Sequence, residues 1–134
     1  MTELPFGEFE LIDRIVARLG DAAASDILVP PGDDSAVWAT AEGVIVASID
    51  TAVEGTHWYA GSPLNDAGWR AISGAISDIA AMGAEVQQLL VATVIGPGVS
   101  IDALDALIDG MADACRRHDA QIAGGDIVRG QQTT

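Results

Sequence analysis

The second half of this chain alternates amphipathic helical stretches with apolar runs of strand length. Apolar residues at helical spacing predict helices over 65–82 and 100–118. A strand-like run follows each of them, over 86–95 and 121–123. Such alternation is typical of domains in which helices cover a sheet.

The first half has the same ingredients in a different order. Residues 8–19 have helical spacing, whereas 36–38 and 43–49 have the composition of strands. Residues 21–35 and 52–63 are predicted loops. The whole order predicts an α/β (α+β) domain, a two-layer sandwich of a mixed sheet with helices on one face.

Local signals place the ends of these elements. Asn65 and Ser100 are the residue types that cap helices, and Gly20 and Gly83 are typical helix stops. The Gly-Gly-Asp sequence at 124–126 is predicted to be a turn that ends the last strand. The apolar stripe expected on the helix over 100–118 consists of Ile101, Leu104, Ile108, Met111 and Cys115.

The charged residues are very unevenly divided. The chain has 20 acidic residues against 6 basic ones, all arginine, for a net charge of −14. This charge argues against nucleic acid as a partner, because nucleic-acid binders carry a basic patch. The absence of lysine excludes a P-loop, the protein-kinase strand lysine and Schiff-base chemistry. Any phosphate chemistry would therefore depend mainly on metal ions and backbone N–H groups.

Length and cysteine content indicate how many domains the chain forms and in which compartment it works. The 134 residues suit one domain, 1–134, and the single Cys115 permits no internal disulfide, which favours a cytoplasmic location. No apolar run reaches the ~18 residues of a membrane span, so no membrane partner is expected. Because the chain stops at Thr134 with no closing element after its Gly-Gly-Asp sequence, we predict a fragment that lacks a C-terminal domain.

The aspartates fall into two groups. Those over 102–113 lie mostly away from the apolar stripe and are predicted to be a solvated helix face. Asp34 lies in a glycine-containing loop, Asp50 and Asp126 follow strands, and Asp78 lies in an alanine-rich helix. Each alone could be a cap or an Asx-turn. Together they favour a Mg²⁺ site, since carboxylates gathered at strand ends repel one another unless a cation compensates them.

Three other side chains could bind a metal, contact a substrate or act in catalysis. His57 could contact substrate or be a solvated loop residue, and it is too far from Cys115 and His118 in sequence to suggest zinc. A Cys–His nucleophile pair stays open, but Cys115 falls on the apolar stripe and is predicted to be a core residue. The residues alone thus predict a metal-dependent α/β domain that handles phosphate.

Several motifs in order resemble one family. They are Gly-Glu-Phe at 7–9, Gly-Asp-Asp-Ser-Ala at 32–36, Ser-Ile-Asp-Thr at 48–51, His-Trp at 57–58, Ser-Asp-Ile-Ala-Ala-Met-Gly-Ala at 77–84 and Gly-Gly-Asp-Ile-Val-Arg-Gly at 124–130. The chain is similar to the N-terminal domain of the thiamine-monophosphate kinase family, within the aminoimidazole ribonucleotide (AIR) synthetase superfamily. The resemblance covers nearly the whole chain.

The resemblance implies an activity and a set of site residues. The implied enzyme is a phosphotransferase that uses ATP and Mg²⁺ to convert thiamine phosphate to thiamine diphosphate by direct in-line transfer, as a homodimer. It implies Mg²⁺ ligands at Asp34, Ser48, Ile49, Asp50, Asp78 and Asp126. It also implies ATP contacts at Gly125 and Asp126, and a thiamine phosphate contact at His57, with no catalytic side chain.

The chain departs from the family pattern at three positions. Ile49 replaces a usual Thr, so only its backbone carbonyl could bind metal; Ala75 replaces a usual Asn, and Trp58 replaces a common Phe. Two alternatives stay open: another ATP-using member of the superfamily, and a catalytically silent nucleotide-binding dimerisation module.

Overall fold

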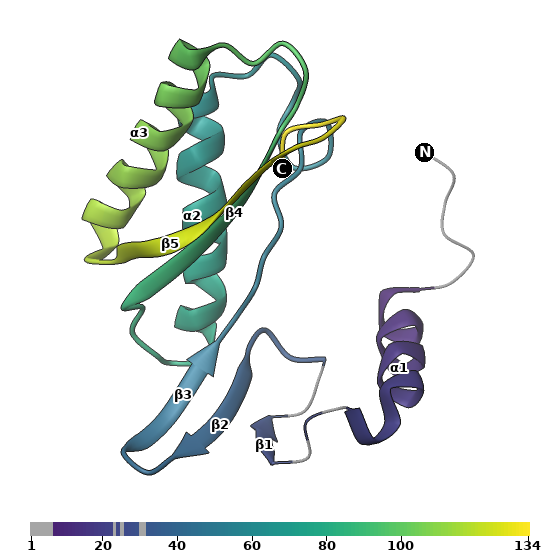
Figure 1. The fold of residues 1–134 in the computed structure, drawn as a ribbon. Coiled ribbons are helices and arrows are strands. Elements are labelled where there is room, and N and C mark those ends of the chain that lie inside the picture. The colour runs from purple at the N-terminus through teal and green to yellow at the C-terminus, as the bar shows by residue number, and fades with distance from the viewer. Residues whose placement is uncertain (1–6, 23, 25, 30–31) are drawn as a thin grey trace. The chain divides into compact units, whose positions relative to one another are not determined.

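The computed structural model describes residues 7–22, 24, 26–29 and 32–134. Contacts divide the chain into two compact units, Met1–Ser48 and Ile49–Thr134. The described residues form helices α1 to α3, the short 3-10 helix η1 and strands β1 to β5 (Figure 1). The predicted α/β class is confirmed, and its strands are divided between an antiparallel and a parallel sheet.

The first unit combines one helix with an antiparallel sheet. Helix α1 (Glu8–Leu19) has the predicted bounds, and Gly20 at positive φ ends it before η1 (Gly20–Ala22). Strands β1 (Ile27–Val29), β2 (Ala36–Thr40) and β3 (Gly43–Ala47) pair in the order β1-β2-β3. The sequence predicted β2 and β3 but not β1, which falls within the predicted loop over 21–35.

The second unit places two helices on a two-stranded parallel sheet. Its elements are α2 (Leu64–Ala81), β4 (Gln88–Ile95), α3 (Ile101–His118) and β5 (Gln121–Arg129). Strands β4 and β5 pair in parallel, and α2 and α3 lie side by side against the sheet (Figure 1). The helices, β4 and β5 thus form the layered arrangement that the sequence predicted for this half.

Two glycines let the helices of this unit approach closely. A β-carbon built on Gly68 of α2 would lie 2.2 Å from the Leu107 carbonyl oxygen, and one on Gly110 of α3 would lie 1.9 Å from the Asn65 carbonyl oxygen. Neither position has room for any side chain, so the backbones of α2 and α3 are nearly in contact. This close packing determines which face of α3 is buried.

The buried face of α3 differs from the predicted stripe. Met111 and Cys115 are buried as expected, but Ile101 and Ile108 are exposed. The buried residues instead include Leu107 and the small residues Gly110 and Ala114. The helix is rotated because the contact with α2 requires small residues, which a pattern of large apolar side chains does not reveal.

The structure corrects two other local predictions and confirms one. Asn65 does not cap α2, which begins at Leu64 with Pro63 at the N-cap. The Gly-Gly-Asp sequence at 124–126 is not a turn, because β5 runs through it to Arg129. Ser100 does cap α3, with its hydroxyl accepting a 3.2 Å hydrogen bond from the Ala103 N–H.

The last two residues return to β4. Thr134 and Val94 exchange two backbone hydrogen bonds, of 2.7 and 3.0 Å, and the buried Thr133 accepts one from the Glu54 N–H. The N–H and the carbonyl of Val94 both bond to Thr134, so both point away from β5. Thr134 therefore lies at the opposite edge of β4. These bonds tie the loop over 53–58 to the sheet. Among the described helices, none combines the length and apolarity that crossing a membrane would require.

Candidate functional site

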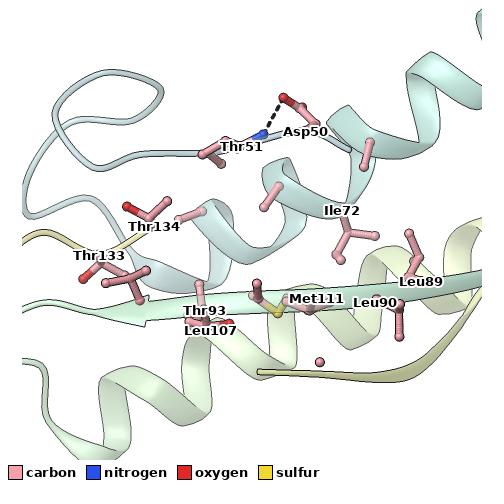
Figure 2. A pocket seen from close by; sticks show the side chains of 18 of the residues that line it. Asp50, Thr51, Ile72, Leu89, Leu90, Thr93, Leu107, Met111, Thr133 and Thr134 are labelled. Atoms are coloured by element: carbon pink, nitrogen blue, oxygen red, sulfur yellow. Dashed lines mark hydrogen bonds between the residues drawn. The ribbon is translucent and has the colours of Figure 1, made fainter. Parts of the chain in front are cut away.

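A cavity of about 560 Å³ lies within the second unit. Its walls come from the segment 49–52, helices α2 and α3, strand β4 and the end of the chain, with Gly125 and Asp126 contributed by β5. Figure 2 shows the segment that bears Asp50 and Thr51 across from the β4 side chains of Leu89, Leu90 and Thr93. The lining is mostly apolar, with a few polar groups among the aliphatic ones.

Two of the predicted metal ligands, Asp50 and Asp126, line this cavity. Both are exposed. They come from opposite ends of the unit: Asp50 precedes α2, and Asp126 lies in the last strand. Folding therefore brings two carboxylates that are far apart in sequence to one cavity, although Asp126 lies within β5 rather than at the strand end that the sequence predicted.

The Asp50 carboxylate is held in place by its neighbours. Its Oδ1 accepts a 2.7 Å hydrogen bond from the Thr51 N–H, drawn in Figure 2. Its Oδ2 lies only 2.8 Å from where a β-carbon on Gly74 would be. The missing side chain at Gly74 thus leaves room for the carboxylate against α2. The sequence pattern does not indicate this role of Gly74, because the contact depends on tertiary packing.

Gly125 lets β5 approach β4 next to Asp126. A β-carbon there would lie 1.8 Å from the Val91 carbonyl oxygen, a distance that no real side chain could adopt. The ladder also shifts register between Leu89 and Leu90, where β5 has one extra residue. Glycine at 125 is therefore required for the strand pairing that places Asp126 at the cavity.

His57 is held by its own loop. The Val53 N–H donates a 2.9 Å hydrogen bond to Nδ1 of His57, and the His57 N–H donates one of 2.8 Å to the Val53 carbonyl. An accepting Nδ1 carries no proton, so the neutral ring has its proton on Nε2. His57 is exposed, which leaves its Nε2–H available as a donor.

The remaining predicted ligands lie outside the cavity lining, except Ile49. Ile49 lines the cavity and its side chain is 95% exposed, whereas Asp78 is half-buried on α2 and is not part of the lining. In the first unit, Asp34 is exposed and its N–H donates to Oδ1 of Asp33, and Ser48 follows β3 directly. Across the part of the chain that the structure describes, no three His, Cys, Asp or Glu side chains form a group that could hold a metal ion.

The chemistry of the donor set still suits Mg²⁺. This ion is usually bound through one or two carboxylates together with substrate phosphates and water, rather than in a cage made only of protein. Asp50 and Asp126 supply two carboxylates at one cavity. The residues therefore fit Mg²⁺ that arrives with a phosphorylated ligand better than they fit a metal bound by the protein alone.

Cys115 is a core residue, as predicted. Burial raises the pKa of its thiol above the ordinary value, and the nearby Arg116 only partly opposes this effect. The thiol is consequently protonated at neutral pH, whereas a nucleophile must be a thiolate. The aspartates at 102, 105, 109 and 113 are all exposed on α3, which confirms the solvated face.

Comparison with known proteins identifies the family. The family model described as AIR synthase related protein, N-terminal domain, matches residues 32–134. The chain belongs to this family. The AIR synthase related domain accounts for all of β2 to β5 and for most of the described residues, and the predicted resemblance is confirmed.

Two relatives of this AIR synthase related domain are named thiamine-monophosphate kinase. The chain is 37% identical over 131 residues to a thiamine-monophosphate kinase of Mycobacterium tuberculosis (strain H37Rv), covering 94% of this chain and 38% of the relative. It is 34% identical over 125 residues to that of Escherichia coli (strain K12), covering 92% and 38%. The chain thus spans less than half the length of these curated relatives.

A solved structure has the same fold. It is described as AaThiL complexed with AMPPCP and TMP, and it matches with a TM-score of 0.84 at 24% identity, covering 99% of this chain and 42% of that one. At this identity the match concerns the fold alone. The fold of the AIR synthase related domain is therefore the one that the sequence predicted.

Proposed function

We propose that this chain is the nucleotide- and metal-binding part of a thiamine-monophosphate kinase. The reaction transfers the γ-phosphoryl group of ATP to thiamine phosphate in one in-line step and gives thiamine diphosphate. The names of the relatives support the activity. The observation that carries the proposal is the convergence of Asp50 and Asp126 on one cavity.

The proposed metal site uses oxygen ligands from several segments. Bound Mg²⁺ would neutralise the charge of the phosphates and orient them for transfer. Asp50 and Asp126 would hold it at the cavity. The other proposed ligands are Asp34, Ser48, the Ile49 carbonyl and Asp78.

The chain's other residues bind and orient the two substrates. Gly125 and Asp126 would contact ATP, and His57 would donate its Nε2–H to the phosphate of thiamine phosphate. That phosphate is largely ionised at neutral pH, because its second pKa is about 6. The nucleophile thus needs no general base, which agrees with assigning no catalytic side chain. The proposed enzyme acts in the cytoplasm, where the lone thiol of Cys115 stays reduced.

The binding site is tested by titrating the chain with ATP in the presence of Mg²⁺. We expect binding in isothermal titration calorimetry, and a loss of affinity of at least about tenfold for Asp50→Asn and Asp126→Asn. Asp105→Asn on α3 is the matched control, because it removes the same charge from an exposed position outside the cavity. Equal loss in the control would show that net charge, rather than this site, governs binding.

The transfer itself is tested by adding thiamine phosphate and measuring thiamine diphosphate by chromatography. Product formation that is lost in Asp126→Asn supports the kinase. Binding of Mg·ATP without product would assign the chain a role as a binding module. Absence of both binding and product would contradict the proposal.

Gly74→Ala separates the stability of the fold from the quality of the site. Alanine in a helix interior is favoured over glycine by up to about 1 kcal/mol, so the melting temperature is expected to stay the same or rise. The new methyl group would displace Oδ2 of Asp50, and affinity for Mg·ATP is expected to fall about three- to tenfold. Calorimetry in the Asp50→Asn background is the control: there Gly74→Ala should have no further effect. An undiminished affinity in the single variant would disprove this role of Asp50.

We also propose that β5 pairs with a second copy of the chain. All nine residues of β5 are exposed, and in the described part of the chain its only partner strand is β4. An open strand edge with exposed Ile122, Ile127 and Val128 is prone to pair with another strand. A symmetric dimer would cover it.

A further inference from the structure

His57 closes the loop over 53–58 on itself. The backbone of Val53 bonds to His57 twice: its N–H donates to Nδ1 of the ring, and its carbonyl accepts from the His57 N–H. The two residues are four positions apart in sequence. Because both partners belong to the same short segment, the closed form is a local property of this loop.

Gly55 shapes the turn that brings these partners together. The Thr56 N–H donates a 3.1 Å hydrogen bond to the Val53 carbonyl and closes a four-residue turn. Gly55 is the third residue of this turn and has a φ of +78°, as in a type II turn, where glycine is strongly favoured. Its N–H also donates a 2.7 Å hydrogen bond to the Trp58 carbonyl. The closed loop therefore depends on glycine at this position.

Only one form of the His57 ring is compatible with the closed loop. A neutral imidazole donates at one nitrogen and accepts at the other, whereas a protonated ring donates at both. A proton on Nδ1 would place two donors opposite each other and break the hydrogen bond from Val53. Histidine is the side chain that ordinarily changes charge between about pH 5 and pH 8. Acid is therefore expected to open this loop.

The charged groups near His57 leave its ring to Val53. The carboxylates closest to it along the chain are Asp50 and Glu54. Asp50 accepts from the backbone next to it, and no carboxylate among the described residues forms an ion pair with His57. Thr133 bonds to the loop from another segment and has no ionisable side chain. The Val53 N–H is thus the group that selects the form of the ring.

We propose that Val53 and Gly55 position His57 by holding its ring in the neutral form with the proton on Nε2, and that acid releases the ring. The role of the held ring rests on the proposed function, in which its Nε2–H donates to the phosphate of thiamine phosphate. A ring that is already held loses less conformational freedom when it binds. Val53 and Gly55 act through His57 and are positioning residues.

Nuclear magnetic resonance of the wild-type, ¹⁵N-labelled chain tests the hydrogen bond directly. An N–H···N hydrogen bond transmits a scalar coupling between its two nitrogens, so we expect one between the Val53 amide and Nδ1 of His57 at about pH 8. The coupling should vanish on acidification, once the ring resonances report protonation. The Ala103 N–H, which bonds to the Ser100 hydroxyl in α3, should keep its resonance. No coupling in the neutral ring, or a coupling that survives protonation, would overturn the proposal.

A second turn of the same kind supplies the matched control for Gly55. Gly61 has a φ of +82° and is the third residue of a turn closed by a 3.0 Å hydrogen bond from the Ser62 N–H to the Tyr59 carbonyl. A β-carbon on either glycine would meet no heavy atom within 4 Å, so valine would strain the backbone similarly at both positions. Gly55→Val is expected to remove the coupling and Gly61→Val to keep it. Equal couplings in the two variants would refute the role of Gly55.

Thiamine phosphate connects the loop to the proposed reaction. At about pH 8, Gly55→Val is expected to weaken its binding about three- to tenfold, as for the loss of one hydrogen bond, and Gly61→Val to leave it unchanged. Undiminished affinity in Gly55→Val would overturn the positioning role. His57→Asn keeps an acceptor for the Val53 N–H but cannot be protonated there, so the Val53 resonance should no longer respond to acid.

The two proposals can fail separately. A wild-type chain that does not bind thiamine phosphate would contradict the proposed function. The coupling between Val53 and His57 is measured without any ligand, so it reports on the loop whatever the outcome of the binding experiment. A Val53 resonance that responds to acid equally in His57→Asn and in the wild type would show that the His57 ring does not control the loop.

Discussion

Gly125→Ala is expected to unfold the second unit or to lower its free energy of unfolding by more than about 3 kcal/mol. The β-carbon would lie 1.8 Å from the Val91 carbonyl oxygen and 2.7 Å from its carbonyl carbon. Both atoms belong to the backbone of β4, so no rotation of a side chain relieves the clash. The strands must separate, and the separation would remove Asp126 from the cavity.

Gly124→Ala is the matched control for this experiment. The neighbouring glycine lies in the same strand, but its β-carbon would meet only Leu90 Cδ2, at the ordinary contact distance of 3.7 Å. Thermal unfolding followed by circular dichroism should show a change within about 1 kcal/mol for Gly124→Ala, together with a large loss for Gly125→Ala. Similar melting curves for both variants would contradict the close approach of β5 and β4.

Ile127→Asp is expected to convert a dimer of this chain into a monomer. The Ile127 side chain is 69% exposed on β5, and an aspartate there would place charge at the strand edge that the second copy is proposed to cover. Desolvating an unpaired carboxylate in such an interface is strongly unfavourable. Sedimentation velocity would report the change directly as a lower mass, and circular dichroism would show that the fold persists.

Ile101→Asp provides the comparison. Ile101 is 71% exposed at the start of α3, where an acidic residue is well tolerated because it complements the helix dipole. This variant should sediment as the wild type does. A wild-type chain that remains monomeric at all concentrations would disprove the pairing, as would a dimer that survives Ile127→Asp.

Periodicity predicted the elements whose pattern is local. Helix α1 has the expected bounds, and β2, β3, α2, β4 and α3 lie within a few residues of their expected positions. Strand β5 was predicted too short because its two glycines resemble a turn. In the structure they permit close pairing with β4, a tertiary property that the local pattern does not contain. The three-residue β1 likewise depends on its partner β2 for its existence.

The candidate site was predictable in residue type more than in arrangement. The positions of Asp50 and Asp126 near strand-like segments suggested that folding would bring them together, and they line one cavity. The contact between Asp50 and Gly74 depends on how α2 packs against the segment before it, as does the cavity itself. The unsatisfied indole N–H of Trp58 depends on which acceptors surround it, which no single segment of sequence specifies.

The hydrogen bonds of Thr133 and Thr134 also affect the order in which the chain can fold during synthesis. The loop over 53–58 carries His57 and leaves the ribosome early, but Thr133 and Thr134 tie it to β4 and are made much later. Contacts between residues so distant in sequence form late, because most of the intervening chain must be ordered first. The nascent chain can assemble α2, β4 and α3 before this step. The loop that carries His57 is then tied to the sheet only after the elements that support it have formed.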